Sequence, residues 1–183
     1  EAGICYIPED RQKRGLALAA QLSENAAISS LISKAFVKGP FLRKSKIKNF
    51  TEDLIQKFDV KTSGPSALAN SLSGGNKQKL IIARELSLGS DVIIAENPTW
   101  GVDLGAINQI HHELLSMRDN GHAILLVSSD LDEIFTLSDR VLVMFESELS
   151  KSFFTEEVTR EELGKLMLMK ASTSTQEPEK NIV

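Results

Sequence analysis

Short apolar runs alternate with amphipathic segments along the second half of the chain. The runs at 92–95, 123–127 and 141–144 have no polar position, which predicts strands buried on both faces. A helix that ends near Gly121 is predicted between the first two runs, since apolar residues recur there at helical spacing: they are Ile107, Ile110, Leu114 and Met117. A short helix is predicted over 131–137. This alternation predicts an α/β fold with a parallel sheet and right-handed crossovers.

The first seventy residues have a different pattern. Residues 3–7 predict a short apolar strand, and the charged segment 8–15 predicts a turn. From about residue 23 to residue 68 the chain is predicted to be mainly helical, with breaks at Gly39-Pro40 and Gly64-Pro65. At the other end, a last helix is predicted from Thr159 to Met169.

Composition places the chain among folded globular proteins. It has 183 residues, of which 42% are hydrophobic and 25% charged, enough for one domain with a real core. The net charge of −4 argues against general nucleic-acid binding. A single cysteine, Cys5, excludes an internal disulfide and is expected to be a small buried hydrophobe in a reducing compartment. No apolar run approaches the roughly 20 residues that span a bilayer.

The segment Leu72–Gln78 combines a hydroxyl and two glycines at the predicted start of a helix. Ser73 is a good N-cap, and Gly74 and Gly75 leave nearby backbone N–H groups unobstructed. The following helix would direct the positive end of its dipole at whatever lies over the glycines, so the pattern indicates phosphate binding. An ordinary cap and turn is the alternative, because short motifs often match by chance.

Neighbouring motifs give this segment its context. The letters LSGGNKQKL resemble the signature motif of ABC-transporter ATPases. Val92–Thr99 resembles that family's Walker B strand and following turn, Gly101–Asp103 its D-loop, and Leu126–Asp130 its switch region. The resemblance extends from Gly3 to Met167. The letters NPTWGVDLGAI and VSSDLDEI are most similar to the second, C-terminal nucleotide-binding domain of importers for simple sugars or nucleosides, in which two such domains lie in tandem on one polypeptide.

The resemblance implies a P-loop-NTPase-like ABC ATPase domain, with a mainly parallel sheet core and a helical subdomain. The expected parts are a core strand and Q-loop-like region at 1–22, the helical subdomain at 23–70, the ABC core at 71–170 and a disordered tail at 171–183. The chain contains no G-x-x-x-x-G-K-[ST], the Walker A loop that cradles phosphates. In the family that loop lies upstream of the strand equivalent to 3–7. The chain is therefore expected to be a fragment that alone binds ATP poorly and is inactive.

Several positions depart from the family's hydrolytic pattern. The metal-associated aspartate position is Glu96, which is one methylene longer and a weak Mg²⁺ candidate. The catalytic glutamate position is Asn97, which cannot accept a proton usefully at neutral pH. The switch histidine position is Ser129, and Glu9 stands about where the Q-loop glutamine would be. We therefore assign a catalytic role to none of these residues. The alternatives are a composite ATP site that has lost hydrolysis, or plain turn residues.

The signature, by contrast, is intact. ABC ATPase sites form between two domains that face head to tail, so the resemblance implies that Ser73, Gly74 and Gly75 reach the γ-phosphate of ATP held by the partner domain. Gln78, one helical turn beyond Gly74, is expected to line the same surface. Asp103 in the D-loop position would link the two sites, with a plain helix N-cap as the alternative. The implied cofactors are ATP and Mg²⁺, mainly at the partner-domain site.

The implied partners are the N-terminal nucleotide-binding domain of the same polypeptide, transmembrane permease subunits and, indirectly, an extracytoplasmic substrate-binding protein. The location would be the cytoplasmic face of the plasma membrane, in bacteria the inner membrane. A second hypothesis is a regulatory module of a soluble ABC-type protein acting on ribosome or nucleic acid. The basic stretch from Lys34 to Lys48, which lacks acids, is interpreted as a solvated face, with lipid head groups or RNA as alternatives.

Overall fold

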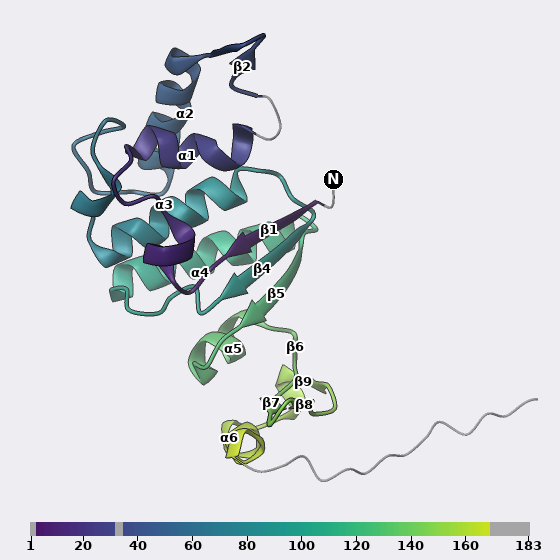
Figure 1. Cartoon of the computed structure of the whole chain (residues 1–183). Helices are drawn as coiled ribbons and strands as arrows, with labels where there is room; N and C mark the ends of the chain where they lie inside the picture. Colours follow the sequence, from purple (N-terminus) through teal and green to yellow (C-terminus); the bar gives the residue numbers. More distant parts are fainter. Residues whose placement is uncertain (1–2, 32–34, 169–183) are drawn as a thin grey trace, which may run out of the picture. The chain divides into compact units, whose positions relative to one another are not determined.

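A computed structural model describes residues 3–31 and 35–168 of the chain (Figure 1). The chain divides into two compact units, the first up to Asp130 and the second from Leu131. The expected tail at 171–183, and Met169 at the end of the predicted last helix, lie outside the described residues. In the part of the chain that is described, no helix is long and apolar enough to cross a membrane.

The first unit is built on a parallel sheet of three strands in the order β1-β4-β5. These strands are β1 (Ile4–Ile7), β4 (Val92–Glu96) and β5 (Ala123–Val127), and all three confirm predicted strands. The register is continuous across the sheet, since Ile7 pairs with Ala95 and Ala95 with Leu126. Parallel neighbours of this kind require crossover connections, and here the crossovers are helical.

Two helices cover one face of this sheet (Figure 1). They are α3 (Gly74–Leu86) and α4 (Leu104–Asp119), each close to its predicted span. The centre of α3 is the most deeply buried part of the unit, where four successive residues have no solvent exposure: Leu80, Ile81, Ile82 and Ala83. A helix that is apolar on every side is expected only where it is surrounded by protein.

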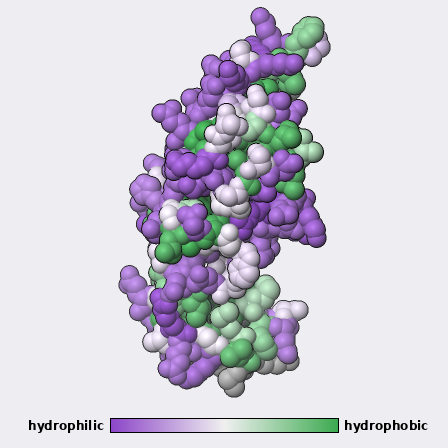
Figure 2. Space-filling model, turned by 90° about the vertical axis from the view of Figure 1, so that its left-hand side faces the viewer, coloured by the Kyte–Doolittle hydropathy of each residue, from purple (hydrophilic) through white to green (hydrophobic). Residues whose placement is uncertain are grey.

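The other face of the sheet departs from the prediction of strands buried on both sides. Ile4, Tyr6, Leu125 and Val127 are each at least 40% exposed, whereas the alternate residues of β1 and β4 are buried. Because successive side chains of a strand point to opposite faces, this alternation shows that the first unit covers only the face that carries its helices. Figure 2 shows the molecule from the left-hand side of Figure 1, where hydrophilic side chains predominate and apolar side chains form several patches.

The segment between β1 and α3 is mainly helical, as predicted. It contains α1 (Leu22–Leu31) and α2 (Lys44–Lys57), with a small antiparallel hairpin of β2 (Val37–Lys38) and β3 (Phe41–Leu42) between them. The predicted break at Gly39-Pro40 is the turn of this hairpin, where Gly39 has a φ of 59°. The sequence did not predict the hairpin, because two-residue strands are too short to have a recognisable period.

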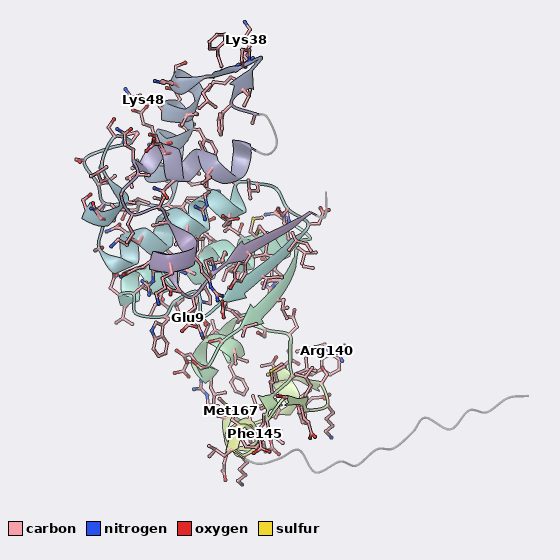
Figure 3. All side chains as sticks on the ribbon, in the orientation of Figure 1. Glu9, Lys38, Lys48, Arg140, Phe145 and Met167 are labelled. Carbon is pink, nitrogen blue, oxygen red and sulfur yellow. The ribbon has the colours of Figure 1, made fainter. Side chains whose placement is uncertain are left out.

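Lysines of the basic stretch lie on the hairpin and on α2, where Figure 3 labels Lys38 and Lys48. Both are exposed, and Lys48 forms an ion pair with Glu52 one turn along α2, at 3.8 Å. This arrangement agrees with a solvated helix face. Lys34 lies outside the described residues.

Two further short helical elements lie between β1 and α3. The charged segment after β1, predicted as a turn, contains a π-helical turn, η1 (Arg11–Gly15), and a 3₁₀ turn, η2 (Ala69–Ser71), precedes α3. Asp10 caps η1 by accepting from the backbone N–H groups of Gln12 at 3.1 Å and Lys13 at 3.0 Å. Such Asx caps compete well with extended backbone, which explains why a polar segment forms a helical turn here.

The second unit is small and largely antiparallel. Its helical elements and paired strands are α5 (Leu131–Leu137), β6 (Arg140–Val141), β7 (Met144–Phe145), β8 (Glu148–Leu149), β9 (Phe153–Phe154), η3 (Thr155–Glu157) and α6 (Arg160–Leu168). Strand β6 pairs with β9 and β7 pairs with β8. The core of the unit is made by Val141, Val143, Val158 and Leu163.

The prediction of a third parallel strand at 141–144 was wrong. That run is divided between β6 and β7, and the chain reverses directly after β7 at Glu146 and Ser147, which have φ values of 45° and 68°. Two successive residues with positive φ form a tight hairpin turn, so the strand pairs with its own continuation. The predictions of α5 and of the last helix were confirmed, the latter up to Leu168.

Cys5 provides a test of the core. It is 3% exposed, and burial, with a smaller contribution from the charge of Glu85, raises its pKa from 9.0 to about 11. A shift of this size lowers the thiolate fraction near pH 8 by about 100-fold. We therefore expect iodoacetamide to modify Cys5 at least about 100-fold more slowly in the folded chain than in urea, by mass spectrometry. Rates that agree within a factor of a few would contradict this packing.

Candidate functional site

The candidate site is the N-terminus of α3. Ser73 is its N-cap, with extended backbone angles, and its Oγ accepts from the Asn76 backbone N–H at 3.4 Å. This confirms the predicted cap. Ser73 and Gly74 are exposed, so the first N–H groups of α3 point to an accessible surface.

The two glycines at this helix start allow other groups to come close. A Cβ on Gly75 would lie 3.2 Å from Asp103 Oδ2, and a Cβ on Gly74 would lie 3.4 Å from Arg11 Nη1. Asp103 is the N-cap of α4 and accepts from the Ala106 N–H at 3.0 Å, which confirms the cap predicted as the alternative role. The structure therefore brings the signature-like segment and the D-loop-like segment side by side.

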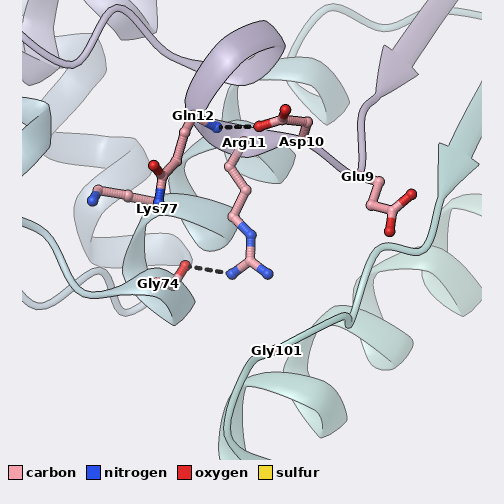
Figure 4. Close-up of a pocket in the computed structure, with 7 residues that line it drawn as sticks. All are labelled: Glu9, Asp10, Arg11, Gln12, Gly74, Lys77 and Gly101. Carbon is pink, nitrogen blue, oxygen red and sulfur yellow. Dashed lines mark hydrogen bonds between the residues drawn. The ribbon is translucent and has the colours of Figure 1, made fainter.

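A pocket of about 330 Å³ opens at the start of α3 (Figure 4). It is lined by Glu9, Asp10, Arg11, Gln12, Gly74, Lys77 and Gly101. The lining comes from the loop after β1, the first turn of α3 and the turn after β4, three segments that are far apart in sequence. Two cations and two carboxylates share it.

Arg11 joins the three segments that form this pocket. It extends from η1 toward α3, where Nη1 donates to the Gly74 carbonyl at 2.9 Å (Figure 4). Its Nη2 donates to the Trp100 carbonyl. Burial lowers the pKa of its guanidinium, which still stays charged at any physiological pH. Neither Arg11 nor Lys77 stands out in the sequence as a site residue. Arg11 is one of three cations in the segment 8–15, and nothing in their spacing indicates which of them reaches α3.

The expectation for Gln78 is corrected by the structure. Gln78 is 1% exposed, and its Nε2 donates to the Pro98 carbonyl at 2.8 Å. It therefore faces the turn after β4 and does not line the surface beside Gly74. The physical reason is that residue 78 lies one turn into α3 on the side of the helix that packs against the protein.

Glu96 ends β4 and accepts a hydrogen bond from the hydroxyl of Tyr6 on the neighbouring strand. This bond raises the pKa of Tyr6, because the hydroxyl proton is held between the phenol and the carboxylate. Across residues 3–31 and 35–168, no group of three or more His, Cys, Asp and Glu side chains could hold a metal ion. Glu96 therefore belongs to no such group among the described residues, and one of its oxygens is already hydrogen-bonded.

Asn97 links β4 to the segment after β5. It has a φ of 40°, a left-handed conformation that asparagine tolerates better than most residues. Its backbone N–H donates to the Val127 carbonyl at 2.7 Å, and its Oδ1 accepts from the Ser129 N–H at 3.0 Å. Two of the positions expected to depart from the family pattern are therefore in direct contact, through the amide oxygen of Asn97.

The comparisons with known proteins identify sequence relatives that match nearly the whole chain. It is 40% identical over 168 residues to the nucleoside import ATP-binding protein NupA of Lactococcus lactis, covering 92% of this chain and 33% of that protein. It is 42% identical over 167 residues to the guanosine import ATP-binding protein NupO of Bacillus subtilis, with 91% and 33% covered. The ribose import ATP-binding protein RbsA of Shouchella clausii is 39% identical over 161 residues, with 88% and 32% covered.

The fold also matches a solved structure. The dimeric ATP-binding cassette MJ0796, in a post-hydrolysis state bound to ADP and Pi, has a TM-score of 0.69 at 18% identity, covering 83% of this chain and 62% of that one. No protein-family model matches the chain. The chain spans about a third of the length of the sequence relatives it matches. Over about nine-tenths of its length the chain is therefore homologous to import ATP-binding proteins for nucleosides and ribose, and it has the fold of an ATP-binding cassette.

Proposed function

We propose that this chain is the C-terminal nucleotide-binding domain of an importer ATPase, and that it lends the start of α3 to ATP held by the partner domain. The observation that carries the proposal is the exposed, glycine-lined N-terminus of α3 beside a pocket that contains Arg11 and Lys77. Free helix N–H groups and two cations together favour a phosphate. Ser73, Gly74 and Gly75 would face the γ-phosphate of that nucleotide.

Two carboxylates complete the proposed nucleotide surface. Asp103 lies against Gly75 and caps α4, so it would connect the donated site with the turn after β4. Glu9 lines the pocket in the loop after β1 and would take the place of a glutamine that meets magnesium. Gln78 would act indirectly, by holding the Pro98 carbonyl under the start of α3.

The chain's own composite site is proposed to be degenerate. An asparagine amide cannot act as a general base, and the Asn97 oxygen is already occupied by the Ser129 N–H. Ser129 offers a hydroxyl where an imidazole would be needed to interact with transferred phosphate. We infer that hydrolysis takes place mainly at the site whose Walker loops belong to the partner domain.

ATP and Mg²⁺ are the cofactors this proposal requires. Mg²⁺ in such sites is held by one or two carboxylates together with phosphate oxygens, so a single carboxylate such as Glu96 fits a weak role in the chain's own site. Its second oxygen is not used by Tyr6. When bound, the ion would neutralise charge on the phosphates, and this chain's residues would only position the nucleotide.

The proposed partners follow from the names of the relatives, which are import ATP-binding proteins for nucleosides, guanosine and ribose. We propose that the complete protein binds a permease at the cytoplasmic face of the membrane, through the helical segment 23–70, and serves an extracytoplasmic substrate-binding protein indirectly. Its cargo would be a nucleoside or a simple sugar. The names of the relatives favour the importer over a soluble protein that acts on ribosome or nucleic acid.

The position of the nucleotide can be tested by cysteine labelling. Cys5 is buried, so a Ser73→Cys variant carries the one reactive thiol of the described chain. In the complete ATPase, with cysteines outside this chain replaced, a non-hydrolysable ATP analogue with Mg²⁺ should protect this thiol from maleimide. At ten times the dissociation constant, labelling should slow about tenfold, because only about a tenth of the sites stay free.

Ser45→Cys is the matched control, since Ser45 is an exposed serine on α2 outside the proposed site. The analogue should leave its labelling rate unchanged. Equal rates for Ser73→Cys with and without the analogue would show that no nucleotide covers the start of α3, and the proposal would fail.

A further inference from the structure

We propose that Asn76 is a positioning residue that turns the hydroxyl proton of Ser73 outward, toward the phosphate. The inference rests on the proposed function, because it concerns how the donated serine meets its nucleotide. Its basis is a chain of hydrogen bonds from the Lys61 N–H through the Asn76 amide to Ser73 Oγ. The contact with Lys61 could not be anticipated from sequence, since residues 61 and 76 belong to different segments.

The orientation of the Asn76 amide is fixed by its first partner. The backbone N–H of Lys61 can only donate, and it lies 2.7 Å from Asn76 Oδ1. The oxygen of the amide must therefore face Lys61, which leaves the NH₂ group to face Ser73. Asn76 Nδ2 donates to Ser73 Oγ at 2.9 Å.

The consequence for Ser73 follows from counting its hydrogen bonds. A hydroxyl has two acceptor lone pairs and one proton. Ser73 Oγ accepts from Asn76 Nδ2 at 2.9 Å and from the Asn76 backbone N–H at 3.4 Å, so both lone pairs face α3. The remaining proton has to point away from α3, toward solvent. An ionised phosphate oxygen can only accept, so this state of Ser73 suits an anionic ligand.

The anchor at Lys61 is itself firmly placed. Lys61 directly follows Val60, which is 4% exposed, and nearby Phe58 is 3% exposed. The Val60 N–H donates to the Ile55 carbonyl of α2 at 2.9 Å. Lys79 of α3 also donates to the Asp59 carbonyl at 3.3 Å. The end of α2 therefore sets the Asn76 amide, and through it the direction of the Ser73 proton.

A double-mutant cycle on the complete ATPase tests the assignment. A hydrogen bond to a charged group contributes about 1.5–3 kcal/mol, so Ser73→Ala should lower kcat/KM for ATP by about 10- to 100-fold. Asn76→Ala should lower it by about 3- to 10-fold, because Ser73 can then donate in other directions. In the Ser73→Ala background, Asn76→Ala should cost nothing more. A merely structural role would make the two losses multiply.

Asn76→Asp sharpens the test. Aspartate keeps an acceptor for the Lys61 N–H but has no proton to donate, so Ser73 would turn its own proton inward to the carboxylate. We expect a larger loss in kcat/KM than for Asn76→Ala, and a smaller one once Ser73 is alanine. Asn108→Ala, which replaces an exposed asparagine on α4, is the control that should leave turnover unchanged.

The outcomes separate this inference from the function on which it rests. If Ser73→Ala leaves kcat/KM unchanged, the donated site itself is overturned. If Ser73→Ala lowers kcat/KM while both Asn76 variants match the wild type, or if the losses multiply in the cycle, the donated site stands and the role of Asn76 is refuted. Circular-dichroism melts of each variant verify that it is folded.

Discussion

Replacing Ser73 with glutamate should abolish ATP turnover by the complete protein. Ser73 caps α3 and is exposed at the start of the helix, where the proposed γ-phosphate would lie. A carboxylate about 4 Å from one negative charge costs about 4 kcal/mol at an effective dielectric constant of 20, which corresponds to a loss of nearly a thousandfold. The measurement is steady-state phosphate release at saturating ATP.

Ser73→Asp separates repulsion from loss of the cap. Aspartate is as good an N-cap as serine, so this variant should melt like the wild type and still be inactive. Ser73→Thr, which keeps the hydroxyl, should retain most of the activity. Turnover by Ser73→Asp at the wild-type rate would refute the proposed donation.

Asn97→Ala gives the contrasting result, because the chain's own site is proposed to contribute little to hydrolysis. It removes the acceptor for the Ser129 N–H and places alanine at a φ of 40°, so stability should fall by about 1–2 kcal/mol. Turnover by the folded protein should change little. If Ser73→Glu and Asn97→Ala both abolish turnover, the two sites are not asymmetric.

The second large effect concerns stability, and it should follow from Arg84→Ala. Arg84 is 6% exposed on α3, and its guanidinium donates to Glu85 Oε1 at 2.7 Å and to the Gly15 carbonyl at 3.0 Å. It also donates to the Asn25 carbonyl at 3.4 Å, so one side chain connects α3 with η1 and α1. Truncation leaves Glu85, which is 7% exposed, without this partner. We expect a loss of about 3–5 kcal/mol in the free energy of unfolding, from urea denaturation.

The control for Arg84 removes both charges together. Buried ion pairs can often be replaced by apolar residues of similar volume at little cost, so Arg84→Met with Glu85→Leu should be more stable than Arg84→Ala alone. A double variant less stable than the single one would mean that the buried charge of Glu85 is not the main penalty.

Much of the fold could be predicted because its signals are local. The runs 92–95 and 123–127 have no polar residue, and these correspond to β4 and β5, while the apolar spacing from Ile107 to Met117 corresponds to α4. Ser73 and Asp103 could be recognised as caps because a cap is defined by a side chain and a backbone N–H three residues away. The prediction of a third parallel strand was wrong, because an apolar run such as 141–144 does not indicate which strand it pairs with.

The sequence by itself determined most of the elements, the family resemblance and the position of the helix start that we propose faces a nucleotide. The tertiary structure alone decided which side chains surround that start. Arg11, 63 positions before Gly74, donates to the Gly74 carbonyl. Gln78 donates to the Pro98 carbonyl, and Asn76 accepts from the Lys61 N–H. Periodicity and caps depend on neighbours within about one turn, so they can be recognised from the sequence. Contacts between distant segments depend on how the helices pack on the sheet, and no local pattern encodes them.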